Sequence, residues 1–449
     1  MQITLMILLT VTAASFLYFY KQRRDLRHPG FWFNVIWFIA GILLALNYND
    51  YYPVSELTVG ICLIGIVSFN IPLYLSKRAP KFNTEKQDID EINDSVIKKI
   101  IIVEWVLFAL CIPIIIRAIS FINSSGIAMM RNIFSDSVTY GYMNALERLI
   151  YIHYIVFPLI KVTSAFHLIF LARGRCKFYT LIPAVLNQVA IFAISVGRND
   201  IFIFIIWGIF AFMLRPHYAK RVTERSERQS NKNAKRIRLI ILIPIASLVV
   251  ISIIRHRIGK GSYVTMFFQI ISTYIAGGFQ LFDLALANRA TWGLDHFTYG
   301  AATLKGALDL LFSVLSTLTG GRIGTPEWFA NANIQTVAAQ FHYVSASKRM
   351  NAYMTMFYYF MRDFGIAGVV GISMLVGRII YKIYYRLVSK PNLYNSVTYL
   401  IMLNVLFFTT IWWEGINSAL FMSMIWNLII CRFITGKWGS GRFKIRRIR

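Results

Sequence analysis

The sequence contains few charged residues, and most of those it has are basic. Asp, Glu, Lys and Arg make up 15% of its 449 residues, whereas 57% are hydrophobic. Soluble domains are roughly a quarter charged. Acidic residues are especially scarce, at 20 against 47 Lys and Arg. This composition excludes an ordinary soluble domain and predicts an integral membrane protein.

Metal-binding and nucleotide-binding patterns are also missing. The four cysteines (Cys62, Cys111, Cys176 and Cys431) have no spacing typical of a metal site or a disulfide framework, so we expect core thiols. The seven histidines show no His-x-x-x-His pattern. The Gly-rich phosphate-binding loop of nucleotide hydrolases is absent. We therefore expect no metal, no cofactor and no ATP-driven transport.

Long apolar runs recur along the chain. A helix of about 20 apolar residues crosses a hydrocarbon core of ~30 Å. We expect an all-α integral membrane protein with eleven transmembrane helices, at residues 3–20, 31–46, 57–75, 100–122, 149–171, 178–196, from 201 onward, 239–254, 366–384, 397–413 and 417–434. Residues 263–287 and 299–318 are also apolar, and if both crossed there would be thirteen spans. Polar interruptions such as Gln269 and Asp283 favour partial insertion instead.

Basic residues gather at alternate ends of these spans, which indicates orientation by the positive-inside rule. This places the amino terminus outside and the carboxyl terminus in the cytoplasm. The basic linker 215–238 has almost no aromatic residues to stack on bases, which argues against nucleic-acid binding. We expect membrane helices in residues 1–254, a long outer loop in 255–362, and membrane helices with a basic tail in 363–449.

Arginines concentrate in and beside the outer loop. Ionisable groups near membrane spans are costly and by default mark function, and arginine offers a fork of donors matched to phosphate oxygens. The candidates for an anion site are Arg198, Arg255, Arg257, Arg289, Arg322 and Arg349, and Arg362 also lies beside the ninth span. The alternative is that they extend to the interface or pair with acids such as Asp200 and Asp283. His342 and His296 are candidate general bases.

Two short motifs late in the chain resemble a known signature. Asn351-Ala-Tyr353-Met354-Thr355, then Asp363-Phe-Gly365 and Gly368, resembles the Asn-x-Tyr-Thr…Asp-Phe-Gly-x-x-Gly signature of bacterial Wzy-type O-antigen polymerases, with Met354 inserted. The Gly-Arg pair ending at Arg198 and the run Thr273-Tyr-Ile-Ala-Gly-Gly278 are similar to further landmarks of that family. The layout of about eleven spans with one long periplasmic loop is similar too. The resemblance covers roughly residues 100–430.

The resemblance implies a glycosyltransferase of the lipid-linked-donor class in the bacterial inner membrane. Such polymerases transfer a growing glycan from undecaprenyl pyrophosphate to an incoming lipid-linked repeat unit, without metal or nucleotide. A flippase and a chain-length regulator are the expected protein partners. In related O-antigen ligases a histidine precedes the matching asparagine, and Met350 at that position speaks against a ligase. A ligase and a flippase or other transporter remain alternatives, which the formation of a new glycosidic bond would distinguish.

Overall fold

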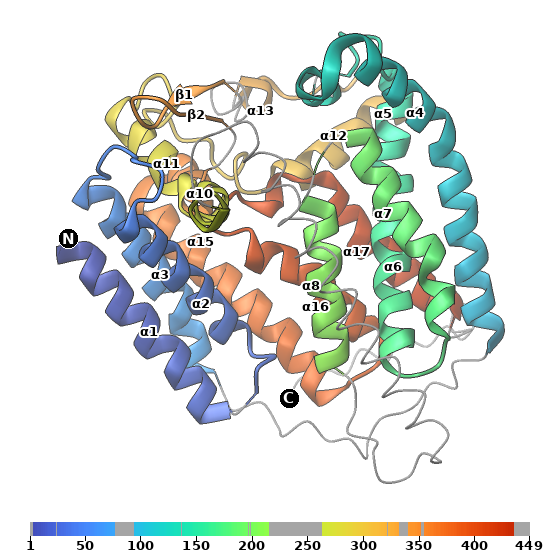
Figure 1. Ribbon diagram of the computed structural model, residues 1–449, viewed down its shortest axis with the longest axis horizontal. Coiled ribbons are helices and arrows are strands. Elements are labelled where there is room, and N and C mark those ends of the chain that lie inside the picture. The colour runs from blue at the N-terminus through green and yellow to red at the C-terminus, as the bar shows by residue number, and fades with distance from the viewer. Residues whose placement is uncertain are drawn as a thin grey trace. The chain divides into compact units, whose positions relative to one another are not determined.

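The chain is helical in almost every segment that the structure describes. The computed structural model describes residues 3–23, 25–76, 94–135, 137–195, 197, 199–214, 263–320, 322–331, 340–351 and 354–434 (Figure 1). Within these ranges the strands are two short ones, β1 (His342–Tyr343) and β2 (Arg349–Met350), which pair antiparallel. The predicted all-α class is confirmed.

Among the described residues, seven helical segments are long and apolar enough to cross a membrane. They cover residues 3–21, 29–46, 56–75, 94–126, 145–172, 178–195 and 356–389. An eighth candidate is a helix pair, 268–275 and 277–287, that is bent by 44° at its break. Three shorter apolar helices cover 199–213, 393–407 and 418–434. The protein is therefore a membrane-embedded helical protein. The predicted span 239–254 lies outside the described residues.

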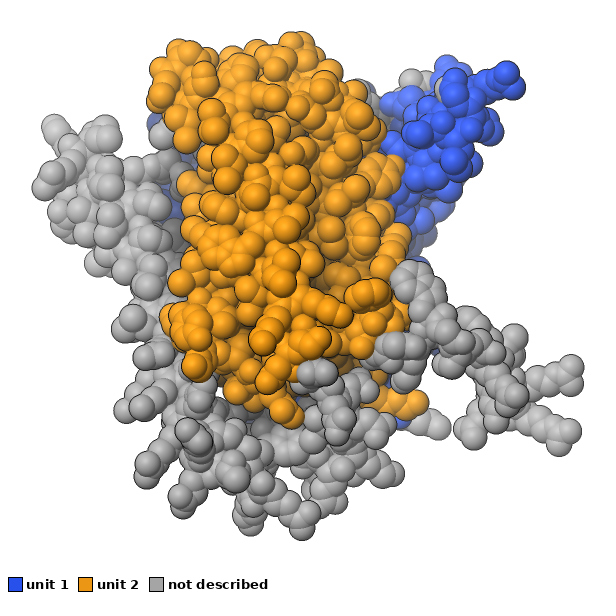
Figure 2. Space-filling model, turned by 90° about the vertical axis from the view of Figure 1, so that its right-hand side faces the viewer, with its two compact units in different colours: residues 1–82, 234–389, 402–420 blue, residues 83–233, 390–401, 421–449 orange. Residues whose placement is uncertain are grey.

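The chain forms two compact units, which are coloured separately in Figure 2. Unit 1 comprises residues 1–82, 234–389 and 402–420, and unit 2 comprises residues 83–233, 390–401 and 421–449. Each unit is assembled from segments far apart in the sequence. The expected division into residues 1–254, 255–362 and 363–449 concerns position relative to the membrane, and it stays a prediction.

Unit 1 is built around a set of packed long helices. They are α1 (Ile3–Arg23), α2 (Pro29–Leu46), α3 (Glu56–Leu75) and α15 (Met356–Ser389). α1 packs on α2 and α3, and α3 runs along α15 (Figure 1). The last contact is close because two glycines leave room. A Cβ at Gly65 would lie 2.2 Å from the Phe357 ring, and one at Gly377 would lie 2.3 Å from the carbonyl oxygen of Phe69.

The segment predicted as the outer loop folds into several shorter elements of unit 1. They are α10 (Tyr263–Ile275), α11 (Gly277–Ala287), α12 (Lys305–Leu318), α13 (Glu327–Asn331) and the β1–β2 hairpin. The 3-10 turn η4 (Glu414–Ile416), from later in the chain, lies beside them. α10 contacts α2, α11 contacts α3, and α12 contacts η4. Asp283 of α11 accepts hydrogen bonds from Ser55 and Thr58, which joins this region to the start of α3.

Unit 2 packs its helices around a separate apolar core. Its elements are α4 (Asp94–Ser135), α5 (Ala145–Arg148), the π-helix η2 (Leu149–Tyr154), α6 (Val156–Ala172), the 3-10 turn η3 (Phe178–Leu181), α7 (Ile182–Ser195) and α8 (Asn199–Met213). α4 packs on α6 and α7, and α6 packs on α8. α16 (Leu393–Phe407) and α17 (Ser418–Ile434) contribute residues to both units. None of the four cysteines forms a disulfide and all are buried, as expected for core thiols.

Three pairs of charged side chains lie in the described part of unit 2. His167 Nδ1 lies 2.8 Å from Glu104 Oε2, and both side chains are almost completely buried. Lys161 Nζ lies 2.9 Å from Asp200 Oδ1. Arg117 binds Glu147 and also donates to the carbonyl of Tyr142. Each of these pairs neutralises its charges within the unit.

Candidate functional site

The candidate site lies where α15 is interrupted. The helix loses helical geometry at Phe364 (φ −147°, ψ 24°) and Gly365 (φ 62°, ψ −147°). A positive φ of this kind is readily adopted only by glycine. The residues before the break, from Met356 to Asp363, are buried, whereas Phe364 is 42% exposed. The break therefore places Arg362 and Asp363 at the end of a buried helical segment.

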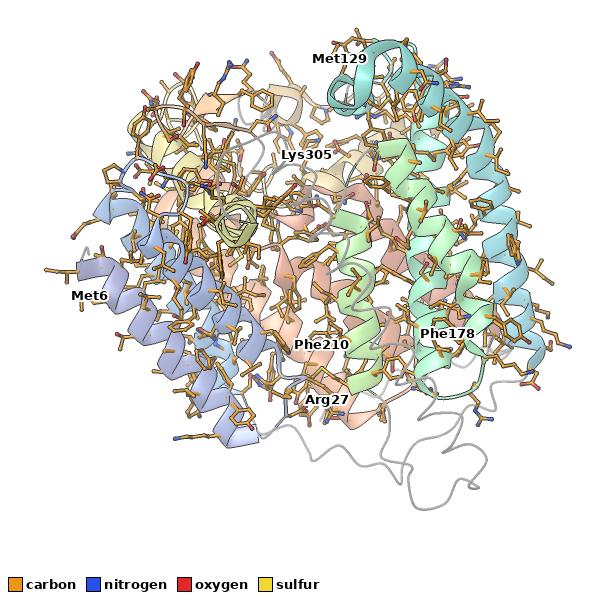
Figure 3. All side chains as sticks on the ribbon, viewed as in Figure 1. Met6, Arg27, Met129, Phe178, Phe210 and Lys305 are labelled. Atoms are coloured by element: carbon orange, nitrogen blue, oxygen red, sulfur yellow. The ribbon has the colours of Figure 1, made fainter. Side chains whose placement is uncertain are left out.

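Asp363 binds a turn that is distant in sequence. Its side chain is fully buried. Its Oδ1 accepts hydrogen bonds from the Thr298 hydroxyl and from the Ala302 amide (2.9 Å), and its Oδ2 accepts one from the Thr303 amide (2.8 Å). Hydrogen bonds to an ionised carboxylate are among the stronger ones in proteins. Asp363 thus holds the 298–303 turn, which leads to Lys305 at the start of α12 (Figure 3).

Arg362 is a buried cation without a carboxylate partner among the described residues. Its side chain is 8% exposed. Its Nη1 donates to the Tyr358 hydroxyl over 3.3 Å, and its Nε has no hydrogen-bond partner in the described part of the chain. The guanidinium fits against Gly293, where a Cβ would lie 2.6 Å from Nη2. A buried charge is expensive unless it is paired, so this arginine has unused capacity to bind an anion.

An aromatic chain connects Arg362 to His342. The Tyr358 hydroxyl, which accepts from Arg362, donates to the carbonyl oxygen of Trp292 over 2.9 Å. The Trp292 indole is buried, and its ring centroid lies 4.5 Å from that of His342. His342 itself is half-buried. The structure therefore brings the first candidate base to the same part of unit 1 as Arg362.

The two sequence motifs pack directly on each other. A Cβ at Gly277 would lie 2.1 Å from the Met350 side chain. A Cβ at Gly278 would lie 2.1 Å from the carbonyl oxygen of Thr410 and 3.2 Å from the Thr355 side chain. The Gly-Gly pair therefore lets α11 approach the segment that leads into α15. Asn351, in that segment, is half-buried.

The remaining candidates are spread more widely. Arg289, Arg322, Arg349 and His296 are exposed. The Arg349 guanidinium lies 5.2 Å from the centre of the Tyr343 ring, across the β1–β2 hairpin. Arg198, Arg255, Arg257 and Tyr353 lie outside the described residues.

A polar network holds the β1–β2 hairpin in unit 1. Lys348 donates to the Asn49 side chain, and the amide group of Asn49 donates to the Tyr51 hydroxyl and to Thr273. Burial lowers the pKa of Lys348, and the nearby charge of Asp50 only partly offsets this. Thr273 opens the second landmark run, so this network joins that run to the hairpin carrying His342 and Arg349.

Arg362 is not among the arginines that the sequence predicts for the anion site, although it lies beside the ninth predicted span. A usable signal was present, because Arg362 directly precedes Asp363 of the motif. Its close fit against Gly293 and its hydrogen bond to Tyr358 depend on the fold, which brings Gly293 beside it. Among the described residues, no three His, Cys, Asp or Glu side chains are grouped so as to hold a metal ion.

Comparisons with known proteins identify no relative. No protein-family model, no curated protein and no solved structure matches this chain.

Proposed function

We propose that this protein polymerises oligosaccharide repeat units linked to undecaprenyl pyrophosphate, as the resemblance to Wzy-type O-antigen polymerases implies. It would act at the periplasmic face of the bacterial inner membrane. The proposed topology has eleven spans, comprising the seven long helices, the three shorter ones and residues 239–254. The amino terminus is then periplasmic and the carboxyl terminus cytoplasmic.

The observation that carries this proposal is the packing of the two landmark motifs beside Arg362, a buried arginine with no carboxylate partner among the described residues. Residues 273–278 and 351–355 are far apart in sequence, yet Gly278 approaches Thr355 closely. The same segment continues into α15, where Arg362 and Asp363 lie. This meeting of the two motifs in one region of the fold supports the proposal.

Arg362 supplies the positive charge that a departing pyrophosphate requires. When the glycan leaves the lipid, negative charge builds up on the pyrophosphate, and a preorganised cation in a water-poor site stabilises that charge strongly. Exposed arginines such as Arg289 and Arg322 are screened by solvent and supply less. Arg362 is therefore the pyrophosphate-binding residue in our proposal.

The reaction forms one glycosidic bond and breaks one sugar–phosphate bond. A hydroxyl oxygen of the incoming repeat unit attacks the anomeric carbon of the growing glycan. The electron pair of the breaking bond goes to the pyrophosphate oxygen, and the hydroxyl proton goes to a base. We assign the base to His342 over His296, because His342 lies against Trp292 and thereby near Arg362.

The test is polymerisation by purified protein in lipid bilayers, supplied with the undecaprenyl pyrophosphate repeat unit extracted from its native cells. A ladder of glycan multiples on a gel is expected. Arg362→Gln should reduce the rate roughly 100-fold or more, whereas Arg378→Gln, an exposed position on the same helix, should retain it. His342→Ala should abolish the ladder and His296→Ala should leave it intact.

Other outcomes separate the alternatives. Movement of the lipid-linked glycan across the bilayer without a new bond would overturn the polymerase proposal in favour of a transporter. Transfer of finished glycan to a lipid A-core acceptor, without a ladder, would favour a ligase. If Arg362→Gln and Arg378→Gln were equally active, the pyrophosphate site would lie elsewhere.

A further inference from the structure

Three aromatic side chains form an exposed cluster beside the break in α15. Phe297, Tyr299 and Phe364 are 51%, 72% and 42% exposed. The Tyr299 ring centroid lies 6.3 Å from that of Phe297 and 6.2 Å from that of Phe364, with the ring planes near perpendicular. Phe297 also reaches Gly365, where a Cβ would lie 3.4 Å from its ring. We call these three side chains the aromatic platform.

The backbone beneath the aromatic platform is held firmly. Thr298, between two of the rings, donates its amide to the carbonyl oxygen of Arg362 and its hydroxyl to Asp363. Tyr299 has a φ of 46°, which is uncommon for a residue with a side chain. Such a conformation persists only when the surrounding contacts enforce it, and it is concentrated at functional sites. The backbone that carries the rings is therefore held in place, and the three rings lie together rather than singly on the surface.

The aromatic platform is next to the buried arginine along the chain. Phe364 follows Arg362 by two residues, so their Cα atoms are no more than about 7 Å apart. In a lipid-linked glycan the first sugar is joined directly to the pyrophosphate. A pyranose ring bound beside Arg362 would present its apolar face to neighbouring rings, and aromatic side chains with a polar handle such as Tyr suit this contact.

We propose that Phe297, Tyr299 and Phe364 stack on the sugar that is attached to the pyrophosphate of the lipid-linked glycan. This inference rests on the proposed function, because it takes the pyrophosphate to be bound at Arg362. It assigns selectivity for that sugar to the aromatic platform, and charge stabilisation to Arg362. The two roles are separable by experiment.

The test compares the triple variant Phe297→Leu, Tyr299→Leu, Phe364→Leu with the wild type in lipid nanodiscs. The control is Phe202→Leu, which alters a comparably exposed ring on α8 in unit 2. The KM for the lipid-linked repeat unit should rise about tenfold or more in the triple variant, with kcat little changed and thermal melting retained. Tyr299→Phe should keep most of the wild-type KM, because the ring remains.

Binding measurements distinguish sugar from lipid. Glycan freed from its lipid by mild acid hydrolysis should bind the wild type and lose affinity in the triple variant, whereas sugar-free undecaprenyl pyrophosphate should bind both equally. An equal loss of affinity for undecaprenyl pyrophosphate would show that the rings hold the lipid and would overturn the inference. An unchanged KM in the triple variant would overturn the inference, and the rings would then only anchor the protein at the membrane interface.

The same measurements separate this inference from the proposed function. If the wild type forms no ladder, the polymerase proposal fails. If free glycan still binds the wild type and the triple variant loses this binding, the result would nevertheless support the proposed role of the aromatic platform. If the ladder forms and free glycan binds wild type and variant alike, the aromatic platform is wrong while the polymerase stands.

Discussion

The two units treat buried charge differently. In unit 2 the buried Glu104 faces His167, and Lys161 faces Asp200, so each charge meets an opposite one. In unit 1 the adjacent buried Arg362 and Asp363 do not pair with each other. Asp363 instead binds a turn, and Arg362 has no carboxylate partner in the described part of the chain. Paired charges are typical of a scaffold, whereas an unpaired one indicates a place for a ligand.

Glu104→Ala should be the most destabilising change, since it breaks the buried pair of unit 2. Removing one partner leaves the other polar group buried alone, which typically costs about 3–5 kcal/mol. Chemical denaturation in detergent should show this loss, with activity per folded molecule unchanged. The double variant Glu104→Leu, His167→Leu should recover most of the stability. A double variant as unstable as the single one would contradict the idea that the pair serves only the scaffold.

Asp363→Ala should lower both stability and activity. It leaves the buried amides of Ala302 and Thr303 without acceptors, at about 1–3 kcal/mol each. The aromatic platform would lose its support, so polymerisation should fall together with the melting temperature. Asp309→Asn is the control, because Asp309 forms only a partly exposed i,i+4 pair with Lys305. Asp309→Asn is expected to lower the free energy of unfolding by about 0.5 kcal/mol or less.

Gly278→Ala tests the close packing of the two motifs. The added methyl would overlap the carbonyl oxygen of Thr410, and overpacking of this kind typically costs about 1–3 kcal/mol. Gly60→Ala in α3 is the matched control, since nothing lies within 4 Å of its Cβ position. That substitution should be neutral or stabilise the helix by up to about 1 kcal/mol. Equal melting temperatures for the two variants would show that the approach at Gly278 is not tight.

The smallest effect concerns pH and the turn between α1 and α2. Burial alone would raise the pKa of Asp25, but hydrogen bonds and charge from Arg27 and a hydrogen bond from Tyr384 outweigh it, and the pKa is lowered. Arg27 is labelled in Figure 3. The ionised Asp25 therefore stabilises the folded protein fully above its unfolded pKa of about 4. This contribution to the free energy of unfolding is lost as pH falls through the lower folded pKa.

We expect the contacts of Asp25 in this turn to contribute roughly 1 kcal/mol or less to the free energy of unfolding. Asp25→Asn should remove that part of the acid dependence of the melting temperature, whereas Asp309→Asn should leave it in place. An acid profile identical in wild type and Asp25→Asn would exclude the contribution.

The sequence identifies the important segment better than the important side chain. The motif singles out the run from Asn351 to Gly368, and this run contains the break of α15. The arginines selected for an anion site include three that are exposed, Arg289, Arg322 and Arg349. Residue type and charge are the same for all arginines in a sequence, and burial is not visible there. Arg362 stands out only once Gly293 and Tyr358 are seen beside it.

The sequence is enough to assign the class of this protein, because a helix must carry about 20 apolar residues to cross a membrane and such runs can be read directly from the sequence. It is also enough to predict that the cysteines are buried thiols. Which charges are paired depends on the tertiary structure, because those contacts join residues that are distant in sequence. Asp363 binds Thr298 across 65 positions, and Glu104 meets His167 across 63. Pairing at such distances depends on how helices pack, and no local pattern encodes it.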